Sequence, residues 1–324
     1  MIQASVLITV FNESAPYLEA AFQSILGQSF RNFEVIVVDD GSTNVETKCF
    51  LQRIARIDER VKIHRQVNSG QTFALNAGLR QCTAEFIFRH DADDWSEPMR
   101  FEKLYSLIQE DAATALVGGN YRYIDGEGHP LHCTNLPGEW DQIRAYFEQG
   151  NPFGHGTVCF RKSVITSVGG YRERFRHCQD YDLFWRVTER YRTRNTSDVV
   201  YNYRVSDRTQ TFRSAQSFVR EVAMARLLAS QRRTTGRENM EEAARATEWI
   251  MTSRAMAAVA EERMGDQLLL NRRYFRAFSR YLAAIKRGRF AYPMAKMARA
   301  LVWSVAPAAR TRLFRGDSGN RRVS

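Results

Sequence analysis

The chain has 324 residues, 44% of them hydrophobic and 26% charged, a composition typical of a globular protein with one large or two small cores. The net charge of +11 is uneven: residues 1–210 carry 24 Lys and Arg against 27 Asp and Glu, whereas residues 211–324 carry 23 against 9. This asymmetry favours a separate C-terminal role on an anionic surface. The uncharged apolar stretch at 300–309 is too short to span a bilayer, which excludes it as a membrane span.

Strand and helix patterns alternate through the first 118 residues. Apolar, β-branched runs predict strands at 5–10, 33–38, 61–64, 86–91 and 115–118, and the segments between them have apolar residues at helical spacing. The run at 33–38 is apolar at nearly every position, as expected for a parallel strand covered on both faces. Repeated strand–helix units predict an α/β fold with a doubly wound, mostly parallel sheet flanked by helices.

Carboxylates follow two of these strands where they end. Asp39 and Asp40 follow the second predicted strand, and Asp91, Asp93 and Asp94 end the fourth. In such sheets ligands bind at the carboxyl ends of the strands. Like charges so close need a counter-charge, which Mg²⁺ or Mn²⁺ provides together with the oxygens of a bound phosphate. The alternative interpretation is a solvated acidic turn.

The sequence lacks the glycine-rich motifs that bind phosphates directly. There is no G-x-G-x-x-G after a strand and no G-x-x-x-x-G-K-[ST] in the first half. A phosphate-bearing ligand is therefore expected to be held through a metal. Metal-bound diphosphate beside carboxylates that can face a nucleobase indicates a sugar nucleotide.

Beyond residue 120 the regular alternation stops. Residues 121–128 predict a hairpin, and the loop at 151–157 is rich in turn residues and contains His155. Asp180 and Asp182 fall in the first turn of the next predicted helix. Acidic residues there are favoured by the helix dipole, so stabilisation of the helix N-terminus is the alternative to a catalytic role.

The C-terminal region, 211–324, is predicted to be helical and basic, following a catalytic body at 1–210. Residues 274–315 contain ten Lys and Arg, and one helical face there is apolar: Met294, Met297, Leu301 and Val305. Lys296, Arg299 and Trp303 fall on another face. Such a helix can lie in an anionic membrane interface; the alternative is a helical subdomain packed on the body with a solvated basic face. No nucleic-acid-binding module is recognisable, so no nucleic-acid partner is expected.

The cysteines and the N-terminus bear on the compartment. The five cysteines include no CxxC pair, and Met1 leads directly into a strand pattern without a secretory signal. We expect a reducing, cytoplasmic environment, with peripheral contact at the inner face of the membrane as an option for the basic region.

Four segments in this order resemble family 2 glycosyltransferases of the GT-A fold: residues 5–14, 24–30, 33–43 and, as the DxD motif, 90–95. The resemblance covers residues 3–205 and implies a nucleotide-sugar half at about 1–118 and an acceptor half at 119–210. It implies a metal-dependent enzyme that transfers sugar from a nucleotide-diphospho-sugar, UDP-linked, to a hydroxyl acceptor with inversion. The acceptor it implies is a glycan or lipid-linked saccharide in cell-surface glycan or polysaccharide biosynthesis, and the cofactor it implies is Mn²⁺ or Mg²⁺.

The resemblance also implies roles for the residues of the nucleotide half. Thr9, Phe11 and Glu13 match the wall around the base and ribose. Asp40 matches the carboxylate that binds the pyrimidine imide, with Asp39 supporting its turn. Asn76 lies on the helix beside the nucleotide and is expected to line the site.

The metal and the catalytic base are assigned in the same way. Asp91 and Asp93 match the DxD pair, with Asp93 as the more direct metal ligand and Asp91 nearer the ribose. Asp180 matches the general base. The family usually has Glu-Asp at this place, whereas this chain has Gln179-Asp180, which changes the hydrogen bonding around the acceptor.

Two residues, His155 and Trp185, are weaker candidates for contact with the acceptor. The alternative for His155 is a loop histidine without a function. The alternative for Trp185 is a position in the hydrophobic core. Two rival functions also stay open. A nucleotidyltransferase of similar fold usually has a glycine-rich loop after strand one, which the turn at 11–14 lacks, and a non-catalytic scaffold is suggested only by Gln179. The Gln-x-x-Arg-Trp signature of processive synthases is absent, which favours a non-processive enzyme.

Overall fold

The computed structural model describes residues 2–205, 215–251 and 274–287, with short pieces of 258–266 and 293–297. The chain forms two compact units. The first contains residues 1–124 and 133–204, and the second contains 125–132 and 205–324. The division falls at residue 204; the domain boundary at 210 stays a prediction, and the assignment of 125–132 to the second unit was not predicted.

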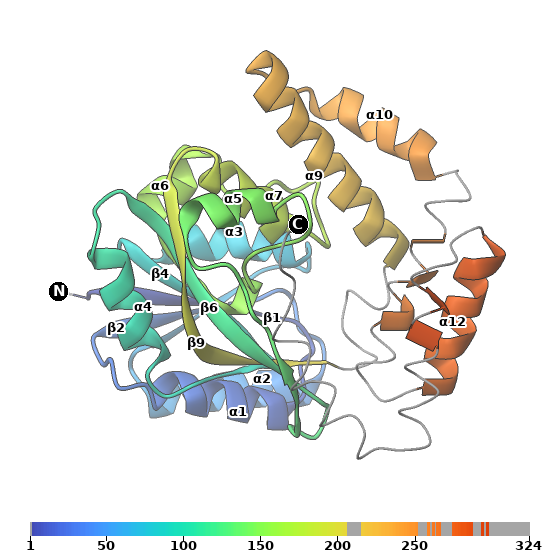
Figure 1. The fold of residues 1–324 in the computed structure, drawn as a ribbon. Coiled ribbons are helices and arrows are strands. Elements are labelled where there is room, and N and C mark those ends of the chain that lie inside the picture. The colour runs from blue at the N-terminus through green and yellow to red at the C-terminus, as the bar shows by residue number, and fades with distance from the viewer. Residues whose placement is uncertain are drawn as a thin grey trace. The chain divides into compact units, whose positions relative to one another are not determined.

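The first unit is built on one mixed sheet (Figure 1) with the strand order β3-β2-β1-β4-β8-β6-β9-β5. β3, β2, β1 and β4 are parallel, as predicted. Beyond β4, the short β8 lies antiparallel between β4 and β6, and β5 is antiparallel to β9. The strands are β1 Ala4–Val10, β2 Phe33–Asp39, β3 Val61–Arg65, β4 Phe86–Asp91, β5 Trp95–Ser96, β6 Thr114–Ile124, β7 Pro130–Cys133, β8 Cys159–Arg161 and β9 Arg192–Arg204.

Helices cover both faces of this sheet (Figure 1). They are α1 Ala15–Leu26, α2 Val45–Ile57, α3 Gln71–Gln81, α4 Arg100–Gln109, α5 Trp140–Tyr146, α6 Lys162–Ser167 and α7 Gln179–Thr188, with a short 3₁₀ turn, η1, at His155–Thr157. α1, α2 and α4 share a core with the alternate strand residues Val6 and Ile8. α3 packs on the opposite face, where a Cβ at Gly78 would lie 2.2 Å from Leu7. This glycine therefore permits the close approach of α3 to β1 and β2.

Aromatic packing holds β4 in place. Phe88 of β4 stacks on Phe101 of α4 with ring centroids 4.3 Å apart, and Phe33 of β2 meets the same ring edge-on at 5.4 Å. Each such pair contributes about 0.5–1.5 kcal/mol beyond the burial of its area. The carboxyl end of β4, which carries the acidic run, thus extends from a rigid core.

The described C-terminal part of the second unit is helical, as predicted, with α9 Ala215–Thr235, α10 Met240–Met251 and α12 Tyr274–Lys286. Ala277, Tyr281 and Ala284 of α12 are buried. Two cations of the basic stretch 274–315 are paired with an acidic residue, because Arg280 and Arg287 both contact Glu261. Leu301, Trp303 and Val305 lie outside the described residues.

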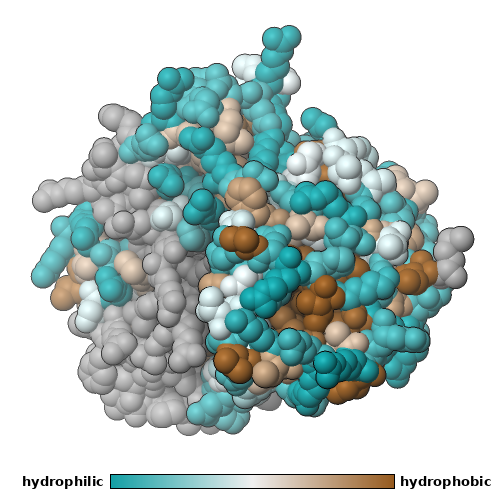
Figure 2. Space-filling model, turned by 180° about the vertical axis from the view of Figure 1, so that it is seen from behind, coloured by the Kyte–Doolittle hydropathy of each residue, from teal (hydrophilic) through white to brown (hydrophobic). Residues whose placement is uncertain are grey.

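The described surface is mainly hydrophilic when seen from behind, with hydrophobic residues in a few groups (Figure 2). Among the described residues, no helix has the length and apolar character needed to cross a membrane.

Candidate active site

Three strands end side by side at the carboxyl edge of the sheet. The register pairs Thr9 of β1 with Val38 of β2 and with Asp91 of β4, and it pairs Val10 with Asp39. The segments that follow β1, β2 and β4 therefore start from neighbouring positions. This is the convergence of acidic strand ends that the sequence pattern predicts.

Asn12 ties the turn after β1 to the turn after β2. It has a positive φ of 50°, a conformation that asparagine tolerates better than most residues. Its Oδ1 accepts hydrogen bonds from the backbone N–H of Thr43 at 2.7 Å and of Asn44 at 3.0 Å, and its own N–H donates to Ser42 Oγ. The neighbouring Phe11 is left 50% exposed. An exposed phenyl ring at a strand end can stack on a base, but the contact of Phe11 with the nucleotide stays a prediction.

Asp39 and Asp40 have different partners. Asp39 Oδ1 accepts the backbone N–H of Ser42 at 2.8 Å and so supports the turn, as predicted. Asp40 is 3% exposed, and its carboxylate accepts hydrogen bonds from Gln66 Nε2 and from the backbone N–H groups of Ser69 and Gly70, at 2.7–2.9 Å. A carboxylate has about four acceptor positions, so one remains for a ligand N–H. Asp40 thus orders the loop before α3, and its contact with a pyrimidine stays a prediction.

The acidic run after β4 consists of three carboxylates in different environments. Asp91 forms an ion pair with Arg89, and its backbone N–H donates to Tyr201 Oη at 2.9 Å. Asp94 is 1% exposed and accepts the backbone N–H of Arg204 at 2.7 Å. Asp93 has no ion-pair partner among the described residues. Burial, together with repulsion from Asp91 and Glu13, raises the pKa of Asp93.

These residues fit a divalent cation that takes most of its ligands from elsewhere. No cluster of three or more His, Cys, Asp or Glu able to enclose a metal occurs in the described part of the chain. The raised pKa of Asp93 nevertheless marks a place where negative charge lacks compensation. A metal there would draw its other ligands from a bound diphosphate and from water, which is how Mg²⁺-type ions commonly bind.

Asp180 is in the first turn of α7. Its Oδ2 accepts a hydrogen bond from Asn151 Nδ2 at 2.9 Å. Burial raises the pKa of Asp180 to about 6, and the charges of Arg89 and Asp91 both act on it, which places it electrostatically in the same site. A carboxyl group with a pKa near the working pH is suited to general-base catalysis.

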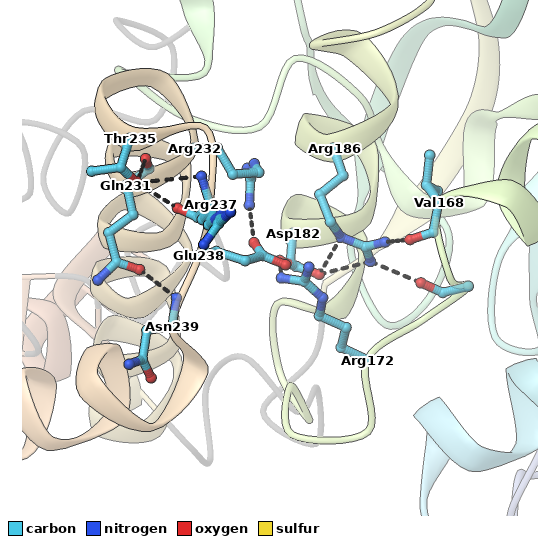
Figure 3. A network of polar contacts seen from close by, with 11 residues as sticks. Val168, Arg172, Asp182, Arg186, Gln231, Arg232, Thr235, Arg237, Glu238 and Asn239 are labelled. Atoms are coloured by element: carbon cyan, nitrogen blue, oxygen red, sulfur yellow. Dashed lines mark hydrogen bonds and ion pairs between the residues drawn. The ribbon is translucent and has the colours of Figure 1, made fainter.

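Asp182, two residues further along α7, faces a different environment (Figure 3). Its Oδ1 accepts from Arg172 at 3.1 Å, and its Oδ2 accepts twice from Arg186, at 2.8 and 3.0 Å. Arg186 in turn donates to the carbonyls of Val168 and Gly170. Two residues along a helix correspond to about 200° of rotation, so Asp180 and Asp182 point to nearly opposite sides. Asp182 is structural: it holds the loop before α7.

Three side chains of α3 bind the segment that leads into α7. Asn76 bonds both backbone groups of Tyr171, at 2.7 and 3.1 Å, and Thr72 Oγ1 donates to the carbonyl of Phe175 at 2.6 Å. Gln179 Nε2 donates to Gln71 Oε1 at 3.0 Å. The structure therefore places the Asn76 amide against Tyr171 as a loop anchor. Its predicted contact with the nucleotide is not supported by this geometry and stays a prediction.

Of the two weaker acceptor candidates, Trp185 is buried and His155 is half-buried. Trp185 is 4% exposed and stacks on Phe147 with ring centroids 5.3 Å apart. An acceptor role for Trp185 is therefore not supported, because its ring is in the core. His155 Nε2 lies 2.9 Å from Tyr171 Oη, and burial together with Arg89 holds the pKa of His155 well below its usual value. Neutral His155 supports Tyr171 and the loop that carries Asp180.

Three polar residues of the site were not identified from the sequence: Arg89, Asn151 and Tyr201. Arg89 had a signal, because a charged residue inside an otherwise apolar strand needs a buried partner. Asn151 and Tyr201 had none, since their partners Asp180 and Asp91 are distant in the sequence.

A curled mixed sheet with acidic residues at the ends of its central strands is the GT-A fold of glycosyltransferases. Two solved structures share it. A mannosyltransferase from Pyrobaculum calidifontis, in complex with GDP-Man and Mn²⁺, has a TM-score of 0.57 and 16% identity over 97% of this chain and 84% of that chain. TarS 1–349 from S. aureus, in complex with UDP-GlcNAc, has a TM-score of 0.58 and 17% identity over 92% of this chain and 91% of that chain.

The chain belongs to glycosyl transferase family 2, whose model matches residues 5–169. The O-antigen biosynthesis glycosyltransferase WbnJ of Escherichia coli is 32% identical over 206 residues, 62% of this chain and 79% of that protein. The amylovoran biosynthesis glycosyltransferase AmsE of Erwinia amylovora is 30% identical over 233 residues, which are 71% of this chain and 87% of that protein. An E. coli UDP-Gal:alpha-D-GlcNAc-diphosphoundecaprenol beta-1,3-galactosyltransferase is 28% identical over 56% of this chain and 66% of that protein. The protein is a glycosyltransferase, as the motifs predict.

Proposed function

We propose that the enzyme transfers a sugar from a UDP-linked donor to a hydroxyl of a lipid-linked saccharide, with inversion, during assembly of a cell-surface polysaccharide. Two relatives that act in O-antigen and amylovoran biosynthesis support the pathway class, and the diphosphoundecaprenol-linked acceptor of a third relative supports the acceptor class. The UDP-GlcNAc bound by one structural neighbour supports the donor class.

Asp180 carries the proposal. It is a carboxyl group at a helix start, oriented by Asn151, with its pKa raised to about 6. In the proposed reaction Asp180 removes the proton of the acceptor hydroxyl as that oxygen attacks the anomeric carbon. A single base opposite the leaving group produces direct displacement and inversion, in contrast to glycosidases, which use a pair of carboxylates around the bond.

Asp93 would hold the divalent metal, and Phe11 and Asp40 would bind the base. When bound, Mn²⁺ or Mg²⁺ neutralises charge on the departing diphosphate. Asn12 keeps the turns after β1 and β2 in place before the donor arrives, and Asp40 does the same for the loop before α3, because their hydrogen bonds are already formed within the protein.

The basic C-terminal region is proposed to bring the enzyme to an anionic membrane surface. A lipid-linked acceptor is held at the membrane, so an enzyme bound there would be close to its substrate. The uneven charge, with 23 Lys and Arg against 9 Asp and Glu in residues 211–324, supports it.

The function is tested by incubating the protein with UDP-sugars and GDP-sugars, with Mn²⁺ or with EDTA, and measuring nucleotide release. A thermal-shift screen of the same donors identifies the sugar, since a ligand at 100 times its Kd stabilises by about 2.7 kcal/mol. Donor-specific, Mn²⁺-dependent release that increases with a diphosphoundecaprenol-linked acceptor supports the proposal. Binding of every donor without any release would indicate a non-catalytic scaffold.

A further inference from the structure

Arg89 is a fully buried cation in β4, two residues before Asp91. Its backbone N–H donates to the carbonyl of Val158 at 3.1 Å, and its carbonyl accepts from Arg100 at 2.6 Å. Residues two apart in a strand point to the same face, and the guanidinium forms an ion pair with the Asp91 carboxylate. Nε and Nη2 have no hydrogen-bond partner in the described part of the chain. Asp91 is the single ionic partner of Arg89 there.

This pairing restrains Asp91. Arginine keeps its proton in proteins, so the buried charge cannot be removed by deprotonation. If Asp91 turned away from Arg89, a buried cation would be left unpaired, which is strongly unfavourable. The Asp91 side chain is itself 20% exposed, so it reaches the ligand edge while one of its oxygens stays on Arg89.

The other two carboxylates of the run have no such cation. Asp94 is buried with its Oδ1 on the backbone N–H of Arg204. Asp93 is half-buried, faces the negative charges of Asp91 and Glu13, and has no ion pair among the described residues. Of the three, Asp93 is the one whose charge is available to an added cation.

We propose that Arg89 is a positioning residue that withholds Asp91 from the divalent metal and leaves Asp93 as the single metal-ligating carboxylate of the run. Held in this way, Asp91 faces the nucleoside part of the donor. The Arg89–Asp91 pair has no net charge, so one negative charge instead of two meets the incoming diphosphate. The inference rests on the proposed metal-dependent donor binding.

The test removes the ion pair as a unit. The Arg89→Met/Asp91→Asn double variant keeps the net charge and fills the volume, and replacing both partners of a buried pair is tolerated far better than removing one. Mn²⁺ affinity is measured from the signal of free Mn²⁺ in electron paramagnetic resonance at saturating UDP. We expect the double variant to bind Mn²⁺ within about twofold of wild type, while Asp93→Asn loses at least about tenfold. A tenfold loss in the double variant would make Asp91 a ligand and overturn the inference.

Two single variants test the restraint itself. Arg89→Met frees Asp91 to join Asp93, so Mn²⁺ affinity should rise about threefold or more; Arg89→Lys keeps the charge and should stay at the wild-type value. Unchanged or lower Mn²⁺ affinity in folded Arg89→Met would contradict the inference, and if this variant does not fold, the double variant decides alone. Absence of Mn²⁺-linked UDP binding in the wild type would instead refute the proposed metal-dependent function.

Discussion

Asn151 donates its Nδ2–H to Oδ2 of Asp180 at 2.9 Å, joining the loop before η1 to the first turn of α7. This bond fixes the rotation of the carboxylate. A general base must meet the substrate hydroxyl at hydrogen-bond distance, so its orientation has to be set before the substrate binds. Through this hydrogen bond, the position of the loop before η1 sets the orientation of the proposed general base.

The first prediction concerns the base itself. Asp180→Asn keeps the shape but cannot accept a proton, so transfer should fall by about 10²–10⁴-fold while UDP affinity stays near the wild-type value. Transfer rate and calorimetric UDP titration measure both. A still-active Asp180→Asn would mean that the base is misassigned.

Asp182→Asn is the matched control in the same helix turn. It breaks the buried ion pairs with Arg172 and Arg186, which should cost about 3–5 kcal/mol of stability. Transfer per folded molecule should change far less than in Asp180→Asn. Urea unfolding separates the loss of folded protein from the loss of rate. Complete loss of transfer in fully folded Asp182→Asn would contradict the structural role.

The pH dependence follows from the same carboxyl group. Because the base acts when deprotonated and the pKa of Asp180 is raised to about 6, kcat/KM should be constant above pH 7 and fall below about pH 6. A hydrogen bond donated to a carboxylate lowers its pKa, so Asn151→Ala should move this acid limb to higher pH. The pH–rate profiles of both proteins are the measurement. Superimposable profiles would show that Asn151 does not act on Asp180.

Donor binding should depend on Asp93. Asp93→Ala removes the carboxylate proposed to hold the metal, so the Mn²⁺-dependent part of UDP affinity should disappear. Calorimetric titration of UDP with Mn²⁺ and with EDTA, on mutant and wild type, provides the test. Equal affinity of the two proteins in Mn²⁺ would exclude Asp93 as a ligand.

A stability prediction concerns Glu34, which is 1% exposed at the end of β2 away from the site. Burial alone would raise its pKa, but hydrogen bonds from Lys62, Thr83 and Ser5 outweigh it and lower the pKa to about 2. A lowered carboxyl pKa adds stability above the unfolded pKa, here about 3 kcal/mol at pH 7, which is lost as the pH falls from 4.5 toward 2.

Glu34→Gln should therefore lower the free energy of unfolding at pH 7 by about 2–3 kcal/mol, with a smaller difference near pH 3. Exposed Glu59→Gln is the control and should change it by less than about 0.5 kcal/mol. Urea unfolding at the two pH values measures the difference. A constant difference between pH 7 and pH 3 would rule out this linkage.

The basic region yields a membrane prediction. If residues 274–315 bind anionic lipid, the protein should sediment with anionic liposomes at low salt and be released near 1 M salt, where the Debye length is about 3 Å. Neutral liposomes are the control. No sedimentation at low salt would favour the helical subdomain with a solvated basic face.

The periodicity of the sequence determined the first half of the fold. Strands such as 33–38, apolar at nearly every position, need cover on both faces, and this requirement alone predicts parallel strands with helices between them. The acids at strand ends, Asp40 and Asp91, could be placed at one edge for the same reason. Patterns of this kind are local, so they can be interpreted without knowing the partners.

Only the tertiary structure decided which carboxylate is held in structural ion pairs and which is not. Asp180 and Asp182 look alike in the sequence, yet one is oriented by Asn151 and the other is held by Arg172 and Arg186. Likewise, only the folded chain shows that the Asn76 amide bonds both backbone groups of Tyr171. The charge state and orientation of a buried polar group depend on partners that are distant in sequence, and those partners are known only when the chain is folded.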